Sequence, residues 1–560
     1  MKRIVVIFLA ILLLAGCAGF LDEQNKSSIS NADLYETAVG YETLMTASYT
    51  SLRNIYRITP WLLLAGTDLY EKSFLTADVN IAVYSYYTLF ANNVNVTSFY
   101  TNCYSGIQTV NVGLYYNSLP KDMDENVRET YKSELRFLRA FYHFLLVEQF
   151  GGVAINQEMT LTPRTNMPRN TLEECYDFII SEMEDCINGL GQSTVARVNR
   201  DVVNHYLAKV YLTRGWDLNQ PDDFTKAKQY AQKVFDSRGE IALTYEDLWS
   251  WLNENNSEIL FAVQFDSKSI TTYNVGNNQQ NVFCPSLGDG SIFSKGGLRE
   301  LMVGWNTQMW YAENDARYDA TFMLTFYERY FDYYTVEDKS TLKVRAFFPR
   351  VWGRDYTQEE LDDWLDTHEV VGGSWTFRFV PFIEDEERYR DENHNWSLPP
   401  MKKFDSPASS EYVGISNVSV RDIVLARLGE TYFLYAEACI GLNDFATAAT
   451  YVQKVLDRPG NAKFGRLANA LDGATTREEA LHGYLIESGK EFLGEYNGRW
   501  PELRRTGMLK FMTERYNYDI RELVGLGTSI DFNKYKLRPI PEDAILLNDG
   551  MSREDQNPGY

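Results

Sequence analysis

The chain has 560 residues and is acidic, with 54 Lys and Arg against 77 Asp and Glu and a net charge of −23. Binding to nucleic acid or anionic lipid headgroups depends largely on Lys and Arg, so this balance argues against both partners. Neutral ligands, or a protein partner with a basic surface, fit the charge better.

An apolar run at residues 4–14 follows two basic residues at the start of the chain. Its eleven residues are far fewer than the roughly 20 that span a membrane as a helix. This pattern is typical of a secretory signal, predicted here at residues 1–16. The sequence Leu-Ala-Gly-Cys that ends at Cys17 resembles the lipobox of bacterial lipoproteins, which implies cleavage before Cys17 and lipid attachment there. Residues 17–32 would then be a lipidated tether, and an ordinary signal with a chance cysteine is the alternative.

The five cysteines after Cys17 are an odd number and lie far apart, so they do not form a disulfide framework. Cys175 and Cys186 are eleven residues apart in a helical pattern, about 16 Å along one helix. That distance is too long for a disulfide, and we expect buried free thiols.

Helical patterns begin at residues 33–56. The strongest one runs over 127–145, where apolar residues recur at steps of three and four, and Gly151-Gly152 ends it. The further helical patterns run at 171–189, 201–215 and 223–237.

Two segments repeat each other without a gap. Residues 223–239 (DFTKAKQYAQKVFDSRG) and 444–460 (DFATAATYVQKVLDRPG) are identical at nine of seventeen positions. In the second unit Ala436 and Ala448 are twelve apart, as the small residues of tetratricopeptide helix pairs are. Such pairs bury their apolar faces by stacking, so the repeat predicts a helical repeat scaffold rather than two unrelated amphipathic helices.

Residues 255–420 differ in composition from both helical parts, at about 33–250 and 420–500, and are rich in Asn, Gly, Asp, Tyr and Trp. They predict long loops with a few strands, inserted between the helical parts. Loops of this length in a compact protein usually carry function.

Catalytic motifs are mostly absent. No two of the five histidines have metal-ligand spacing, and neither a nucleophile elbow nor a phosphate loop occurs. Asp122, Asp124 and Asn126 resemble the start of a calcium loop, but the later ligand positions are wrong, so these acids are expected to favour a helix N-terminus. Acidic pairs such as 362–363 leave a glycosidase open as an alternative. We predict no enzyme activity, no cofactor and no catalytic metal, and leave a structural calcium open.

Aromatic residues are abundant, with 38 Tyr, 31 Phe and 11 Trp. A sugar ring has an apolar face that Tyr and Trp cover and a hydroxyl rim that Asn, Asp and backbone groups bind. Two clusters have this composition, although packing explains any single member equally well. The ligand-binding candidates in them are Tyr84, Tyr86, Tyr87, Asn92, Asn93, Tyr273, Asn274 and Phe283.

Several blocks together resemble the SusD/RagB-like nutrient-binding outer-membrane lipoproteins. They span nearly the whole chain in the order of that family. The blocks are CAGFLDE (17–23), ELRFLRAFYHFLLVEQFGGVAI (134–155), DARYDATF (315–322), ARLGETYFLYAEA (426–438), ESGKEFLGEYNGRWPELRR (487–505) and LRPIPEDAILLNDGMSREDQNPGY (537–560).

The resemblance implies a mainly α fold, in which about four tetratricopeptide-like helix pairs support a loop-rich ligand-binding face with small strands. One domain would cover residues 33–560. It also implies a lipid-anchored protein on the outer surface of the outer membrane, which captures glycan as the lid of a SusC-like TonB-dependent transporter. The alternatives are a RagB-like peptide binder, a lipid-anchored glycoside hydrolase, and a tetratricopeptide adaptor that binds only protein.

The resemblance also assigns roles to residues. Arg139, Arg317, Arg499 and Trp500 would hold the fold, with buried Arg–carboxylate pairs as the physical expectation. Ligand contacts would come from two windows, 61–100 and 270–310. Within these windows Asp68 and Trp305 are further candidates for the ligand.

Overall fold

The computed structural model describes residues 31–57, 60–72, 79–162, 164–192, 194–265, 276–283, 300–372, 377–392, 399–405 and 419–560. The helices before residue 250 are α2 (Asn31–Tyr35), α3 (Ala38–Tyr56), α4 (Trp61–Leu64), α5 (Val79–Ser85), α6 (Val94–Tyr116), α7 (Glu125–Phe150), α8 (Leu172–Cys186), α9 (Arg200–Asp217), α10 (Pro221–Arg238) and α11 (Tyr245–Leu248). Those in the insertion are α12 (Gln279–Phe283), α13 (Trp305–Met309), α14 (Ala316–Thr321), α15 (Asp332–Thr335), α16 (Gln358–Leu365) and α17 (Glu386–Glu392).

The C-terminal part is again helical. Its helices are α18 (Leu428–Gly441), α19 (Phe445–Leu456), α20 (Arg477–Glu491), α21 (Arg499–Arg505), α22 (Leu509–Tyr516), α23 (Tyr518–Gly525) and α24 (Glu542–Leu546). The strands are β1 (Tyr70–Lys72), β2 (Ile259–Val263), β3 (Leu301–Val303), β4 (Thr325–Tyr327), β5 (Val344–Phe347), β6 (Arg378–Phe379) and β7 (Ile423–Arg427). The mainly α prediction is confirmed.

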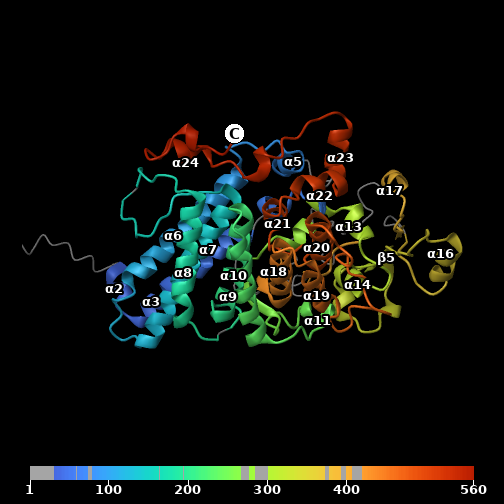
Figure 1. Ribbon diagram of the computed structural model, residues 1–560. Coiled ribbons are helices and arrows are strands. Elements are labelled where there is room, and N and C mark those ends of the chain that lie inside the picture. Colours follow the sequence, from blue (N-terminus) through green and yellow to red (C-terminus); the bar gives the residue numbers. More distant parts are fainter. Residues whose placement is uncertain are drawn as a thin grey trace, which may run out of the picture.

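The long helices form one continuous stack. From α6 to α10 each long helix packs against the next in sequence, and α10 packs against α18, which packs against α19 and α20. Figure 1 shows this row running from the N-terminal helices to the C-terminal ones, with the insertion beyond it. The antiparallel pair β2–β7 closes the insertion where it leaves and rejoins the stack. The comparison of this stack with tetratricopeptide repeats stays a prediction.

The strongest predicted helix is confirmed as α7. The Asp124 side chain accepts hydrogen bonds from the N–H groups of Asn126 and Val127, so it caps the helix as the acids there predict. Gly151 ends the helix with φ 74°, a backbone conformation that favours glycine.

The two copies of the sequence repeat form α10 and α19. Ala227 and Ala448, the matching small residues, are both buried. The ring of Phe224 at the start of α10 lies against Gly215 of α9 and Gly441 of α18. A Cβ atom at residue 441 would lie 2.7 Å from that ring. Glycine therefore allows the two helix pairs to pack closely.

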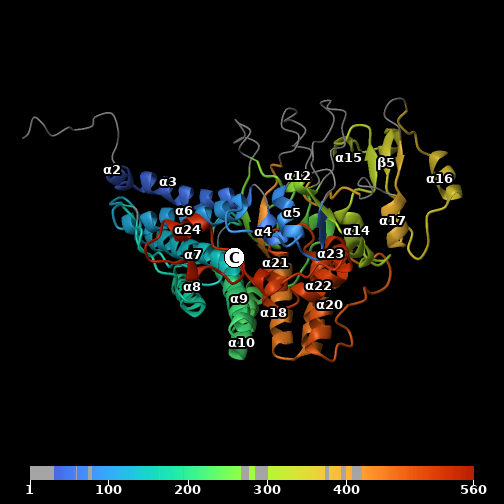
Figure 2. The same ribbon diagram turned by 90° about the horizontal axis from the view of Figure 1, so that it is seen from above.

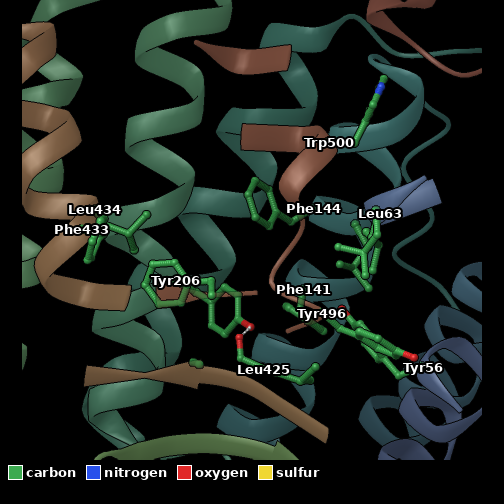
Figure 3. Close-up of a cluster of buried hydrophobic side chains, with 14 of the residues drawn as sticks. Tyr56, Leu63, Phe141, Phe144, Tyr206, Leu425, Phe433, Leu434, Tyr496 and Trp500 are labelled. Atoms are coloured by element: carbon green, nitrogen blue, oxygen red, sulfur yellow. Dashed lines mark hydrogen bonds between the residues drawn. The ribbon is translucent and has the colours of Figure 1, made fainter. Parts of the chain in front are cut away.

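The hydrophobic core joins both ends of the chain. Figure 3 shows side chains from α7, α9, β7 and α18 in one cluster. The Tyr206 hydroxyl donates to the carbonyl oxygen of Leu425 at 2.9 Å, and its ring meets Phe141 edge-on, with 4.9 Å between centroids. The buried cysteines Cys103, Cys175, Cys186 and Cys439 are free thiols, as expected.

A network of buried charges surrounds α20. Glu491 bonds Arg317 and Arg427, both almost fully buried, at 3.1 Å each, and Glu495 accepts from Arg427 at 2.8 Å. Burial alone would raise the pKa of Glu491, but the nearby arginines, Arg427 foremost, lower it to about 2. The carboxylate partners predicted for Arg317 are therefore confirmed.

The other predicted scaffold residues are buried too. Arg139 of α7 pairs with Glu182 of α8 at 2.6 Å. Arg499 has two carboxylate partners, and Trp500 is fully buried. These side chains hold helices together, as the family resemblance implied.

Candidate ligand-binding face

The two windows predicted to carry the ligand, 61–100 and 270–310, meet in a two-stranded antiparallel sheet. β1 pairs with β3, so that Tyr70 lies opposite Val303 and Lys72 opposite Leu301. Helices α5 and α23 pack against β1, and α13 follows β3 directly. We call the surface built from β1, β3, α5, α13, α17 and α23 the β1–β3 face. In Figure 2, α5 and α12 lie on the side of the molecule opposite the outer ends of α10, α18 and α20.

Asp68, the first polar candidate in these windows, is a buried scaffold residue. It is only 1% exposed, and its two carboxylate oxygens accept hydrogen bonds from Arg499 at 2.6 and 2.9 Å. In this conformation its polar atoms are already bonded inside the protein. The ion pair with Arg499 ties α21 to the segment after α4, and the family-based expectation that Asp68 contacts ligand stays a prediction.

Four further candidates are buried. The Tyr84 hydroxyl donates to the Asn93 side chain at 3.0 Å, and the same Asn93 oxygen caps α6. The Tyr87 hydroxyl donates to a backbone carbonyl at 2.6 Å, and the ring of Phe283 lies in the core. Here the Tyr- and Asn-rich composition reflects capping and packing, because these polar atoms satisfy the backbone of α6 and its neighbours.

The remaining candidates divide into two groups. Tyr86 and Trp305 are half-buried and Asn92 is exposed, so all three can reach a ligand at the surface. Tyr273, Asn274 and the lipidation candidate Cys17 lie outside the described residues.

Trp305 and Tyr86 are held in place by their neighbours on the β1–β3 face. The Trp305 ring stacks parallel to Phe382, with 6.4 Å between centroids, and its indole N–H donates to the carbonyl oxygen of Ile383 at 2.9 Å. The Lys72 ammonium lies 5.2 Å from the centroid of the Tyr86 ring. The Trp305 ring is therefore fixed before any ligand arrives, and the Tyr86 ring has a cation beside it.

The structure adds residues that the sequence did not indicate. Arg390 of α17 binds both carboxylate oxygens of Glu71, at 2.9 and 3.0 Å, and its guanidinium lies 3.4 Å from the centroid of the Tyr518 ring. Arg521 of α23 pairs with Glu386 of α17. The first contact joins α17 to β1, and the second joins α23 to α17. The paired residues are more than 100 positions apart in the chain, so no local sequence pattern reveals them.

Asp519 is a carboxyl group of this face whose pKa is raised. It accepts a hydrogen bond from the backbone N–H of Lys72 at 2.8 Å. Burial, and then the neighbouring Glu71 carboxylate, raise the pKa of Asp519 from 3.8 to about 6. The group is therefore close to a change of charge in mildly acidic solution.

The described part of the face combines half-buried aromatic rings with separate hydrogen-bond donors and acceptors. In the described ranges no group of three or more His, Cys, Asp or Glu side chains could hold a metal ion. Aromatic rings with polar groups beside them suit a ligand that has apolar faces and a hydroxyl rim.

Comparison with protein families matches most of the chain. Residues 19–212 match a SusD-like family model described as starch-binding associating with outer membrane, and residues 304–560 match the SusD family model that also covers RagB. The chain belongs to the SusD/RagB-like family. This SusD-like chain thus has the mainly helical fold and family that its sequence blocks predicted.

Two curated relatives support the assignment. A SusD-like protein of Bacteroides ovatus is 27% identical over 279 residues, which are 47% of this chain and 50% of that protein. The match thus spans half the length of that relative. The starch-binding protein SusD of Bacteroides thetaiotaomicron is 26% identical over 476 residues, 77% of this chain and 72% of that protein.

A solved structure shows the same fold. A laminarin-binding SusD-like protein superposes with a TM-score of 0.63 at 19% identity, over 94% of this chain and 100% of that one. The SusD-like chain thus shares its architecture with a solved protein over nearly its full length. Among its described residues, no helix is both long and apolar enough to span a membrane.

Proposed function

We propose that this SusD-like protein binds a neutral oligosaccharide on the β1–β3 face and delivers it to a TonB-dependent outer-membrane transporter, over which it acts as a lid. The observation that carries the proposal is the group of half-buried rings, Tyr86, Trp305 and Tyr518, around the β1–β3 sheet. Such rings bind the C–H faces of sugars, while Lys72 and Asp519 are placed for the hydroxyl rim.

The family supports the proposal from outside the structure. One matching family model is described as starch-binding and outer-membrane-associated, and the names of two related proteins give starch and laminarin as their ligands. Lipid attachment at Cys17 would keep the protein at the membrane, and two or more acyl chains anchor stably. The role is capture without bond cleavage.

The ligand test is a titration of the purified mature chain with neutral oligosaccharides and with peptides, with product analysis of the same mixtures. We expect saturable oligosaccharide binding with no cleavage product. Trp305→Ala should weaken binding by about tenfold, since one ring–sugar contact is worth about 1.4 kcal/mol or less. The exposed Leu252→Ala is the control, because Leu252 is 75% exposed and belongs to none of the elements of the β1–β3 face.

The outcomes separate the alternatives. Binding of peptides alone would favour a RagB-like role, and release of shortened glycan would show a hydrolase. If neither oligosaccharides nor peptides bind, the result would favour the alternative of an adaptor that binds only protein. Equal affinity of Trp305→Ala and the wild type would refute the β1–β3 face as the site. The transporter partner and the lipid anchor are tested by co-purification and by mass spectrometry of Cys17 against Cys17→Ser.

A further inference from the structure

A second groove lies away from the β1–β3 face. It has a volume of about 630 Å³ and lies between α6, the segments 154–162 and 164–167, and the region of α24. This volume falls in the range of roughly 300–1,000 Å³ that small-molecule sites occupy. No residue that lines the groove belongs to the β1–β3 face, so the inference below does not depend on the proposed function.

Hydrogen bonds hold the segments that form the walls of the groove to one another. The Gln108 side chain of α6 exchanges two hydrogen bonds with the backbone of Thr160, at 3.0 and 3.2 Å. On the other side, the Asn548 side chain exchanges two with the backbone of Met167, at 2.9 and 2.8 Å. The Tyr104 hydroxyl adds a bond to the carbonyl oxygen of Ala154 at 2.8 Å. A ligand would therefore find the groove already formed, which lowers the entropy lost on binding.

The floor of the groove is one face of α6. Aromatic and hydroxyl side chains alternate along it at steps of three and four, with Tyr100 and Tyr104 between Thr97, Thr101 and Ser105. The two tyrosine rings lie 4.8 Å apart. Within the described part of the chain, the hydroxyl groups of Thr97, Thr101 and Ser105 make no hydrogen bond. From Thr97 to Gln108 the floor is about 16 Å long, enough for several sugar rings in a row.

The charge of the groove is low for so acidic a protein. Among the described residues that line it, Arg164 and Asp543 are the charged ones, and Arg164 is paired with the Glu158 carboxylate at 2.6 Å. We propose that the groove is a second carbohydrate site, which binds a stretch of a neutral oligosaccharide along α6. The tyrosines would contact the apolar ring faces, and the free hydroxyl groups with the Asn156 side chain would bond the sugar rim.

An apolar peptide is an alternative ligand for the groove. Leu547, which lines the groove, is 74% exposed, so an apolar peptide could also lie there. A peptide offers these hydroxyl groups only its backbone N–H and C=O groups, whereas a sugar presents a hydroxyl group at most of its ring carbons. The carbohydrate is therefore the occupant that the floor favours.

The test uses hydrogen–deuterium exchange on the full mature chain with maltohexaose, laminarihexaose, cellohexaose, xylohexaose and mannohexaose, each in turn. At least one hexaose should slow exchange in residues 154–162 and 541–550. Ser105→Trp, and separately Thr101→Trp, place a bulky ring in the groove from exposed positions. Each should weaken this protection by at least about tenfold in ligand concentration. Ser98→Trp is the control, because Ser98 is exposed on α6 but does not line the groove.

Three results would overturn the proposal. They are no slowing in these two segments with any hexaose, equal slowing in the Ser105→Trp and Thr101→Trp variants, and slowing by a Leu-rich peptide but by no hexaose. Protection of the groove should survive in Trp305→Ala, which alters only the β1–β3 face. Protection of the groove without protection of residues 301–309 and 518–525 would count against the proposed function and leave this one standing.

Discussion

Replacing Asp68 with asparagine decides whether this residue is scaffold or ligand contact. The carboxylate accepts two hydrogen bonds from Arg499 in a fully buried setting. The asparagine side chain would keep one acceptor and turn an amide N–H₂ toward the guanidinium. Each charge-assisted bond contributes about 1.5–3 kcal/mol, so the free energy of unfolding should fall by about 2–4 kcal/mol. Arg499 keeps Glu502 at 2.7 Å, which holds the loss below that of an isolated buried charge.

The assay is guanidinium unfolding of wild type and Asp68→Asn, together with oligosaccharide titration at a temperature where both are folded. The control is Asp472→Asn, because Asp472 is half-exposed and 3.7 Å from Arg466. Such a surface pair is worth about 0–1 kcal/mol. We expect lower stability for Asp68→Asn and unchanged affinity. Wild-type stability combined with lost affinity would refute the scaffold assignment.

Three further predictions concern packing, charge and pH. Gly441→Ala should cost about 1–3 kcal/mol because its Cβ would lie 2.7 Å from Phe224; Gly525→Ala, with open space around it, should be neutral, and equal unfolding midpoints would contradict the close contact. Arg390→Gln should destabilise by about 1–3 kcal/mol, because it leaves the Glu71 carboxylate, 5% exposed, without its cation; hydrogen exchange should quicken in 386–392, and unchanged exchange there would show that α17 is held otherwise. The raised pKa of Asp519 favours its protonated form in the folded state, so its contribution to stability is lost as pH rises from about 4 to about 6. The free energy of unfolding of Asp519→Asn minus that of the wild type should therefore become more positive as pH rises over that range. A value that does not change with pH would show that Asp519 does not titrate with a raised pKa.

The sequence predicted those helices in which the buried apolar residues recur at the spacing of a helix. In α7 the apolar residues recur at helical steps, an acidic cap precedes them and a glycine follows. In α6 the period is hidden, because the helix buries Asn111 and two glycines. At those glycines Tyr142 and Leu135 of α7 pack directly against the helix backbone. A small residue under a large one from a neighbouring helix gives no hydrophobic signal of its own.

The site was only partly accessible from sequence for a similar reason. The composition of the sequence indicated the two windows that β1 and β3 bring together. It did not indicate which of the aromatic side chains in them are buried in the folded protein. Tyr84 is buried and Tyr86 half-buried, although they are two residues apart in a stretch of uniform composition. Arg390 and Tyr518 join the face through contacts that form only when the chain is folded, since nothing near them in sequence is unusual.

The carboxylates of α20 and the turn that follows it have a consequence for how the protein can change. Glu487, Glu491 and Glu495 are spaced by four, and they bind Arg317 from the insertion and Arg427 from β7. These ion pairs thus anchor the insertion to α20 and the turn after it through Arg317. Exchanging the loops for those of a relative would leave every one of these anchors in place. We therefore expect chimeras that keep these charged residues and exchange only loops of the insertion to fold.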